Sequence, residues 1–190
     1  MVNVVVVAPS SRFGLGLGAE NMKKIASVSK EVNLKDASTL LTEEQPGDAS
    51  HKKEFDAILA GADVLLARSL PKDVIKRSPK LQWIQMTFAG MESIVKDKDL
   101  VASPVKLTNA SGIQAPAISE YVITLMLAFD KHLPQFAQLK REKTWQPFTM
   151  VSLQGQTVGI LGFGNIGKEI AKRSKALGMT VIAYDRLRKV

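Results

Sequence analysis

Residues 157–185 read TVGILGFGNIGKEIAKRSKALGMTVIAYD, and this stretch decides the fold of the second half of the chain. An apolar run leads into three glycines, a helical pattern follows them, and a second apolar run finishes on Asp185. A strand, a glycine turn, a helix and a second strand that ends on an acid about twenty residues further on form the dinucleotide-binding unit of the Rossmann fold. Three glycines alone are a weak signal, but the complete unit around them makes the prediction specific.

Each of the three glycines has a physical task in such a unit. Gly162 permits the tight turn out of the strand, Gly164 lets a pyrophosphate lie against the backbone, and Gly167 lets the helix sit close to the sheet. The helix that begins near Asn165 and Ile166 offers its free amides and its positive dipole end to the phosphates. The predicted cofactor-binding residues are Gly162, Phe163, Gly164, Asn165, Ile166, Gly167, Asp185 and Arg186.

The residues at the end of the second strand bear on the choice of cofactor. Asp185 can accept hydrogen bonds from the adenosine ribose hydroxyls, which favours NAD. Arg186 and Arg188 follow it, and a guanidinium there can pair with a 2′-phosphate. We predict NAD as the cofactor and leave NADP open.

The residues before about position 110 have the pattern of a separate α/β domain. Residues 2–8 form a β-branched run, typical of a strand buried on both faces of a parallel sheet. Repeated strand–helix–strand units predict a doubly wound α/β domain over residues 1–110. Further strands are predicted at residues 63–67, 81–86 and 106–108, and helices at residues 19–29, at residues 48–59 and after Pro71.

The pattern changes after Ala110, where we place the domain boundary. Residues 111–116 resemble a linker and run into a helix predicted from Ala117 to Leu127. That helix is expected to continue toward Arg141, with a break or kink at Pro134. Residues 111–190 then hold an incomplete dinucleotide domain, because a complete half of this fold has three strands and only two are predicted. An uncovered apolar face is expected as a result.

Composition narrows the class of protein. Of the 190 residues, 45% are hydrophobic and 23% are charged, which is typical of a soluble globular chain. No cysteine is present, so disulfides and thiolate metal ligands are excluded, and we predict no metal site. The net charge of +8 comes from Lys and Arg residues interleaved with acids rather than with aromatic residues. This distribution favours attraction to an anionic cofactor over binding of nucleic acid.

The apolar runs are also informative about location. They are far shorter than the roughly 20 residues that a membrane-spanning helix needs, and the first residues lack the basic leader of a signal peptide. We therefore expect no membrane association and a cytoplasmic location.

Several stretches carry a family resemblance, namely residues 81–85 with 89–92, then 108–112, 118–122 and 153–167. In this order they resemble the D-isomer-specific 2-hydroxyacid dehydrogenases. The resemblance implies a flavodoxin-like substrate domain followed by an NAD(P)-binding Rossmann domain. It implies hydride transfer between NAD(P)H and a small 2-oxo or 2-hydroxy acid.

The same resemblance implies a substrate site in the first domain. The loop that contains Ala89, Gly90 and Met91 is expected to present backbone amides to the substrate carboxylate. From its position just after a predicted strand, Arg68 has two interpretations of equal weight, a place near the same cleft or an exposed turn position.

The resemblance also implies a homodimer. The helix that matches residues 118–127 helps to build the family's dimer interface, and the region of Trp145 and Phe148 matches one that often embraces the partner subunit. A role in the core of the chain itself is the alternative for these residues.

No catalytic residue is assigned within the chain. In the family an Arg, a His and a carboxylate follow the second strand of the dinucleotide domain, so their counterparts are expected beyond Val190. His51 and His132 do not match the family's catalytic histidine. We therefore expect the chain alone to be inactive. A non-catalytic module of the same fold, which senses a dinucleotide or binds a partner, is the alternative.

Overall fold

The computed structural model describes residues 1–9, 17–43 and 49–187, and the chain forms two compact units, residues 1–110 and 111–190. Two positions used in the sequence predictions, Asp48 and Arg188, lie outside the described residues.

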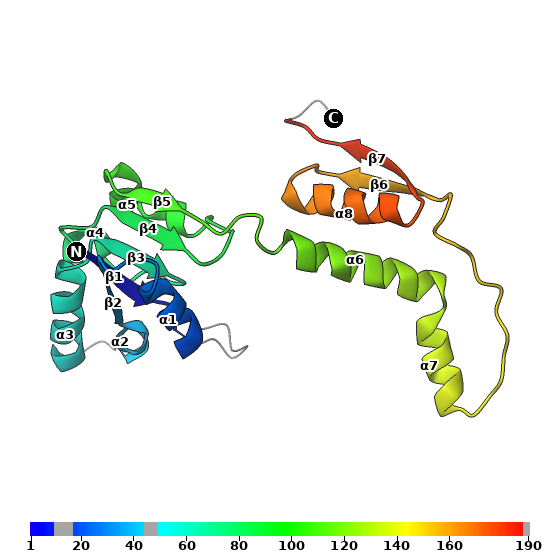
Figure 1. Cartoon of the computed structure of the whole chain (residues 1–190), viewed down its shortest axis with the longest axis horizontal. Coiled ribbons are helices and arrows are strands. Elements are labelled where there is room, and N and C mark those ends of the chain that lie inside the picture. Colours follow the sequence, from blue (N-terminus) through cyan, green and yellow to red (C-terminus); the bar gives the residue numbers. More distant parts are fainter. Residues whose placement is uncertain (10–16, 44–48, 188–190) are drawn as a thin grey trace. The chain divides into compact units, whose positions relative to one another are not determined.

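The first unit is built on a five-stranded, wholly parallel sheet with the strand order β2-β1-β3-β4-β5 (Figure 1). This is the order of the flavodoxin-type doubly wound fold, in which ligands bind at the carboxyl ends of the strands. The predicted α/β fold class is confirmed. The strands are β1 (Val2–Val7), β2 (Val32–Asp36), β3 (Val64–Ala67), β4 (Trp83–Met86) and β5 (Lys106–Thr108).

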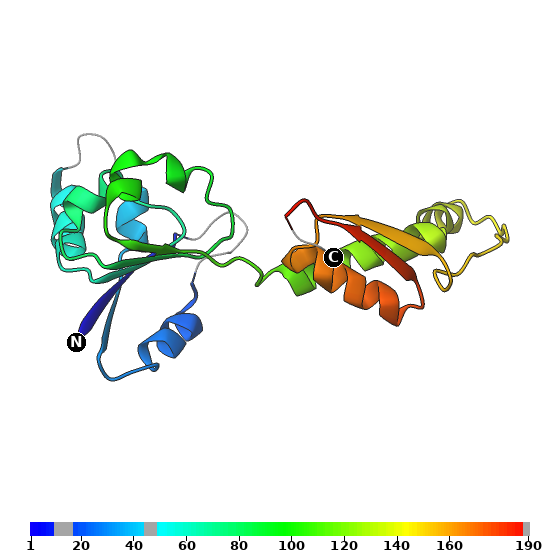
Figure 2. The same cartoon turned by 90° about the horizontal axis from the view of Figure 1, so that it is seen from above.

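Helices lie on both faces of this sheet, but unequally. Figure 2 shows α1 on one side of the sheet and α2 to α5 on the other. None of the side chains of α1 is buried, whereas α2 to α5 close over the main core. The helices are α1 (Ala19–Ala26), α2 (Ser38–Glu43), α3 (Ala49–Ala60), α4 (Val74–Arg77) and α5 (Lys98–Ala102), with a 3₁₀ turn at Ile94–Lys96.

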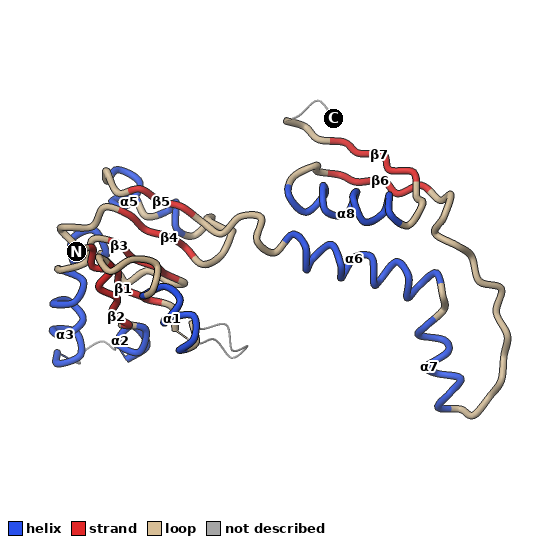
Figure 3. The backbone as a smooth tube through the Cα atoms, in the orientation of Figure 1, coloured by secondary structure: helices blue, strands red, loops and turns tan. Residues whose placement is uncertain are grey.

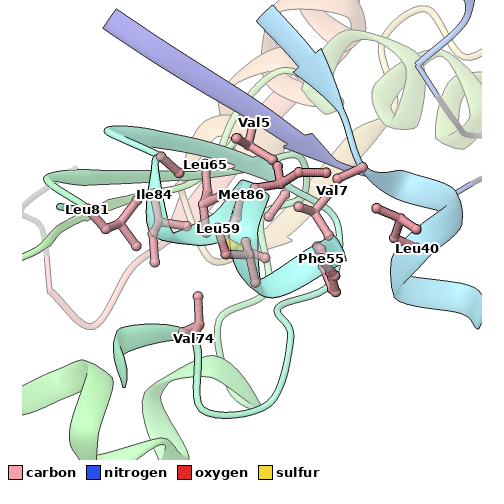
Figure 4. Close-up of a cluster of buried hydrophobic side chains, with 14 of the residues drawn as sticks. Val5, Val7, Leu40, Phe55, Leu59, Leu65, Val74, Leu81, Ile84 and Met86 are labelled. Atoms are coloured by element: carbon pink, nitrogen blue, oxygen red, sulfur yellow. The ribbon is translucent and has the colours of Figure 1, made fainter. Parts of the chain in front are cut away.

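The core of the first unit consists of alternate strand residues packed against α3 (Figure 4). Phe55 and Leu59 of α3 are fully buried against Leu65 and Ile84 of the sheet. Because side chains alternate along a strand, one face of each central strand enters this core and the other face points away. The core therefore fixes the register that positions the loops at the carboxyl ends of the strands.

Strand β2 and helix α2 were not predicted. Only Val32 and Leu34 of β2 are apolar, and both are half-buried, because the strand lies at the edge of the sheet. The strand predicted at residues 81–86 begins instead at Trp83, since the amide of Leu81 donates to the carbonyl of Ser78 in a turn.

The second unit contains the predicted strand–helix–strand arrangement. Strand β6 (Thr157–Leu161) pairs in parallel with β7 (Thr180–Tyr184), and α8 (Asn165–Ala176) connects them. Figure 1 shows α8 lying between the strands and α6 (Ala115–Asp130).

Small residues line the contact between α6 and α8. Ser119 and Ser174 are fully buried, and Ala115 and Ala171 are nearly so. Small side chains allow two helices to approach closely, and Arg173 of α8 forms an ion pair with Glu120 of α6 at 3.3 Å.

The predicted break in the long helix occurs two residues before Pro134. Helix α6 ends at Asp130, His132 takes a left-handed conformation (φ 52°), and α7 (Leu133–Arg141) begins at once (Figure 3). Pro134 is the second residue of α7, where its missing amide costs no helical hydrogen bond.

One face of the β6–β7 sheet carries exposed apolar side chains. Leu161 is 89% exposed, Tyr184 66% and Ile182 62%. Within the described residues no helix covers this face, in agreement with the uncovered apolar face expected from the sequence.

Candidate functional site

The turn between β6 and α8 has the backbone geometry that its glycines predict. Gly162 has φ +93°, a conformation that L-residues with a side chain rarely adopt. Its amide donates to the carbonyl of Tyr184 at 2.8 Å, so the turn leaves the sheet directly from the last rung of the β6–β7 ladder.

Gly167 and Gly164 differ in what surrounds them. A Cβ atom at Gly167 would lie 2.3 Å from the carbonyl oxygen of Gly162, so only glycine lets the first turn of α8 approach the turn this closely. At Gly164, none of the described residues has an atom within 4 Å of the place that a Cβ would occupy. Internal packing therefore explains Gly167, while the open space at Gly164 suits a ligand that approaches the backbone.

The N-terminus of α8 is suited to an anion. Gly164 is the N-cap and supplies no side-chain cap, so the first amides of the helix lack helical partners. The helix dipole adds partial positive charge at this end. Asn165 and Ile166, both predicted as cofactor-binding, are exposed there.

Asp185 lies directly beside this turn. Its Oδ2 accepts a hydrogen bond from the amide of Phe163 at 2.8 Å, and its Oδ1 accepts one from the amide of Leu187 at 2.9 Å. The structure thus brings together the predicted acid and the predicted glycine turn, while Arg186 is exposed at the next position.

Gly112 also adjoins this site; the sequence places it in a linker and in a stretch that carries the family resemblance, residues 108–112, without a role in the cofactor site. It has φ +95°, and a Cβ atom there would come within 2.8 Å of Nδ2 of Asn165. Neither its place in that stretch nor its position just before a predicted helix indicates its neighbour in space.

The loop after β4 is held in place by hydrogen bonds that its backbone carbonyl groups accept. The carbonyl of Phe88 accepts from the amide of Ala110 at 3.1 Å, and that of Ala89 accepts from Nδ2 of Asn109 at 2.7 Å. Within the described residues, the amides of Ala89, Gly90 and Met91 donate to no protein acceptor. Ala89 and Gly90 are exposed, so these amides suit a small anionic ligand. Asn109 lies in residues 108–112, which carry the family resemblance, but the sequence does not predict this positioning role.

A cavity of about 340 Å³ adjoins this loop at the carboxyl ends of β3 and β4. Phe88 belongs both to the loop and to the cavity wall, and Arg68 and Lys72 give the wall two cationic side chains. The lining residues are Arg68, Ser69, Leu70, Pro71, Lys72, Phe88, Ser93, Ile94 and Asp97.

Both histidines have structural neighbours. The Nε2 atom of His51 lies 3.7 Å from a carboxylate oxygen of Glu43, and the ring of His132 stacks on Phe148 with centroids 5.1 Å apart. In the described part of the chain, no group of three or more side chains of the metal-binding types is gathered in one place. None of the described helices is long and apolar enough to cross a membrane.

The pKa values that shift clearly in the second unit belong to α8. A hydrogen bond from Arg173 holds the pKa of Glu169 below its usual value, and the same bond raises the pKa of Arg173. Both residues stay charged at neutral pH, and Arg173 links α8 to Glu120 of α6.

Comparison with known proteins finds a family model that matches part of this chain, and relatives that are similar to most of it. Residues 123–190 match the family model described as D-isomer specific 2-hydroxyacid dehydrogenase, NAD binding domain. The hydroxypyruvate reductase of Thermotoga maritima is 36% identical over 139 residues, which cover 70% of this chain and 45% of that protein. The D-3-phosphoglycerate dehydrogenase of Methanocaldococcus jannaschii is 33% identical over 142 residues, 70% of this chain and 26% of that protein.

Solved structures give the same result for the fold. A D-isomer specific 2-hydroxyacid dehydrogenase family protein of Aeromonas salmonicida has a TM-score of 0.74 at 25% identity, over 100% of this chain and 55% of that one. The NADPH-dependent glyoxylate/hydroxypyruvate reductase of Sinorhizobium meliloti has a TM-score of 0.71 at 19% identity, and the match covers 100% of this chain and 54% of that one. The resemblance predicted from the sequence is confirmed. The chain spans less than half the length of the two curated relatives.

Proposed function

We propose, from the membership of residues 123–190 in the D-isomer specific 2-hydroxyacid dehydrogenase NAD-binding domain family, that this chain serves hydride transfer between NAD(P)H and a small 2-oxo or 2-hydroxy acid. The observation that carries the proposal is the glycine turn with Asp185 hydrogen-bonded to it, in residues that match an NAD-binding family. In this proposal residues 1–110 are the substrate domain and residues 111–190 belong to the cofactor domain.

The residues of the second unit fit a dinucleotide. The pyrophosphate would lie against Gly164 and the first amides of α8, and Asp185 would accept from the adenosine ribose hydroxyls. When bound, the nicotinamide supplies or accepts the hydride. NAD is the proposed cofactor because of Asp185, and the exposed Arg186 keeps NADP as the alternative.

The residues of the first unit fit a small carboxylic acid. The amides of Ala89, Gly90 and Met91 would bind the carboxylate, and Asn109 holds the loop in place through the carbonyl of Ala89. Arg68 and Lys72 add positive charge in the adjoining cavity, which Asp97 offsets in part, so the cavity would favour a small substrate that carries negative charge.

Proton transfer is not assigned to any residue of this chain. Neither His51 nor His132 matches the family's catalytic position, and both contact structural neighbours. The 190 residues by themselves are therefore proposed to bind the cofactor without turning over a 2-oxo acid. The cytoplasmic location expected from the composition stays a prediction.

A homodimer is proposed from the outer side of α6 and the segment after α7. Phe129 is 73% exposed and Trp145 is 92% exposed, and both are large apolar side chains. Light scattering after gel filtration tests this, with Phe129→Lys as the variant that should yield monomers.

The function is tested by titrating the chain with NADH and NADPH in a calorimeter, and by assaying it with glyoxylate and hydroxypyruvate. Cofactor binding without turnover supports the proposal. Failure to bind either cofactor contradicts it, and turnover by the 190 residues contradicts the assignment of proton transfer to residues outside them. A longer protein that contains this chain, binds NADH and has no turnover would favour the non-catalytic module instead.

A further inference from the structure

We propose that Asp185 is a positioning residue as well as a ribose acceptor, because its carboxylate holds the glycine turn in its ligand-binding shape before any cofactor is present. The inference rests on the dinucleotide site proposed above and extends it to the unliganded protein.

The contact lies where the β6–β7 ladder would otherwise end. The amide of Gly162 donates to the carbonyl of Tyr184, the last residue of β7, at 2.8 Å. The next amide, that of Phe163, has no further strand residue opposite it and donates to Oδ2 of Asp185 at 2.8 Å. A side chain thus extends the ladder by one rung into the glycine turn.

The carboxylate is itself oriented by the backbone. Its other oxygen, Oδ1, accepts from the amide of Leu187 two residues on, at 2.9 Å, in the manner of an Asx turn. With one backbone amide on each oxygen, the half-buried carboxylate is fixed in both position and orientation. A carboxylate offers about four acceptor sites, so these bonds are compatible with hydrogen bonds from ribose hydroxyls.

The glycine turn has few side-chain restraints of its own, and its two glycines are held only through their backbone, by the bonds from Gly162 N to Tyr184 O and from Lys168 N to Gly164 O. Gly162 and Gly164 flank Phe163, and glycine loses more conformational freedom on ordering than any other residue. Nothing among the described residues packs against the Cβ position of either glycine. Backbone bonds thus hold the two ends of the turn, and the bond from the Phe163 amide to Asp185 holds its centre.

A positioning role and a purely ribose-binding role predict different results for NADP. If the acid only accepts hydrogen bonds from the ribose, its removal should weaken the binding of NAD. The binding of NADP should then stay equal or become tighter, because the 2′-phosphate no longer meets a negative charge. If the acid also holds the turn, its removal should weaken the binding of both cofactors, because both would place their pyrophosphate on the same backbone.

The test uses Asp185→Ala and Asp185→Asn in the 190-residue chain, with Asp99→Asn as a control that removes an equal charge from an exposed position of the first unit. Amide hydrogen exchange at Phe163 is measured by NMR without cofactor, with Gly162 as the internal reference. We expect Asp185→Ala to accelerate exchange at Phe163 about tenfold or more, and Asp185→Asn to keep most of the protection through its amide oxygen. Dissociation constants for NAD and NADP should both rise about tenfold or more in the alanine variant.

Equal exchange at Phe163 in the wild type and in Asp185→Ala overturns the inference, as does tighter binding of NADP by that variant. If the wild type binds neither cofactor while the exchange contrast is present, the positioning role stands and the proposed function fails. If Asp185→Ala does not fold, a pH titration of the wild-type protein by NMR replaces it. The chemical shift of the Phe163 amide proton should then follow the titration of the Asp185 carboxylate. A shift that ignores this titration overturns the inference.

Discussion

Replacing Gly167 by alanine tests the close approach of α8 to the glycine turn. The new Cβ would lie 2.3 Å from the carbonyl oxygen of Gly162 and 3.2 Å from Cγ2 of Ile160, so the backbone has to move by about 1 Å to reach van der Waals distance. Overpacking of this kind costs about 1–3 kcal/mol. The better helix propensity of alanine offsets at most about 1 kcal/mol. We expect a net destabilisation of the second unit by about 1–2 kcal/mol.

The matched control is Gly164→Ala, three residues earlier in the same turn. Gly164 has φ −77°, which alanine adopts without strain, and nothing described lies within 4 Å of its Cβ position. Its stability should change by less than about 0.5 kcal/mol. Its affinity for NADH should nevertheless fall about tenfold or more, because the methyl group occupies the space through which a pyrophosphate would approach.

Native-state hydrogen exchange of the α8 amides gives the opening free energy of this unit, and calorimetry gives the NADH affinity. Gly167→Ala should lose both stability and affinity, while Gly164→Ala should lose affinity alone. An unchanged opening free energy in Gly167→Ala would refute the packing argument. A loss of stability in Gly164→Ala would show that its open surroundings were misjudged.

Two further predictions concern backbone strain and pH. Gly112→Ala should destabilise the second unit by about 1–2 kcal/mol more than a substitution at an exposed site, because φ at Gly112 is +95°. Gly155→Ala is the control in the same exchange measurement. Gly155 has φ +82° and no described atom near its Cβ position, so this variant reports the cost of φ alone. The pKa of Asp56 lies below its ordinary 3.8 because of hydrogen bonds from Lys52 and Arg77. A lowered folded pKa means that this stabilisation is present above the unfolded pKa and is lost as the pH falls through the folded value. Asp56→Asn should therefore weaken the dependence of the first unit's stability on pH as the pH falls from about 5 to below 3.8, as followed by urea unfolding; an unchanged pH profile would contradict this.

The second unit was predicted well because local pattern and tertiary structure agree there. The boundaries of β6, α8 and β7 follow directly from the glycine motif and from Gly178, which takes φ +75° just after α8. Strand β2 was missed because an edge strand with two half-buried apolar residues gives almost no periodic signal.

The site was predicted as a set of residues but not as a set of contacts. Sequence indicated that Phe163 and Asp185 belong to one cofactor site, and the hydrogen bond between them depends on the pairing of Leu161 with Tyr184. Strand register of this kind is set by packing across the sheet, so it cannot be derived from the motif alone. The role of Asn109 has the same origin, because its partner, the carbonyl of Ala89, is twenty residues away.

The contact between α6 and α8 also has a kinetic consequence. Phe163 and Asp185 are 22 positions apart in sequence, whereas Arg173 and Glu120 are 53 apart. Closing the longer loop costs about 0.8 kcal/mol more in chain entropy, so the strand–helix–strand unit is expected to form before α6 docks onto it. A substitution such as Ser119→Leu in the docking surface should then accelerate unfolding and leave the folding rate almost unchanged. The lifetime of the folded second unit, rather than the speed with which it is reached, would depend on a few small side chains between two helices.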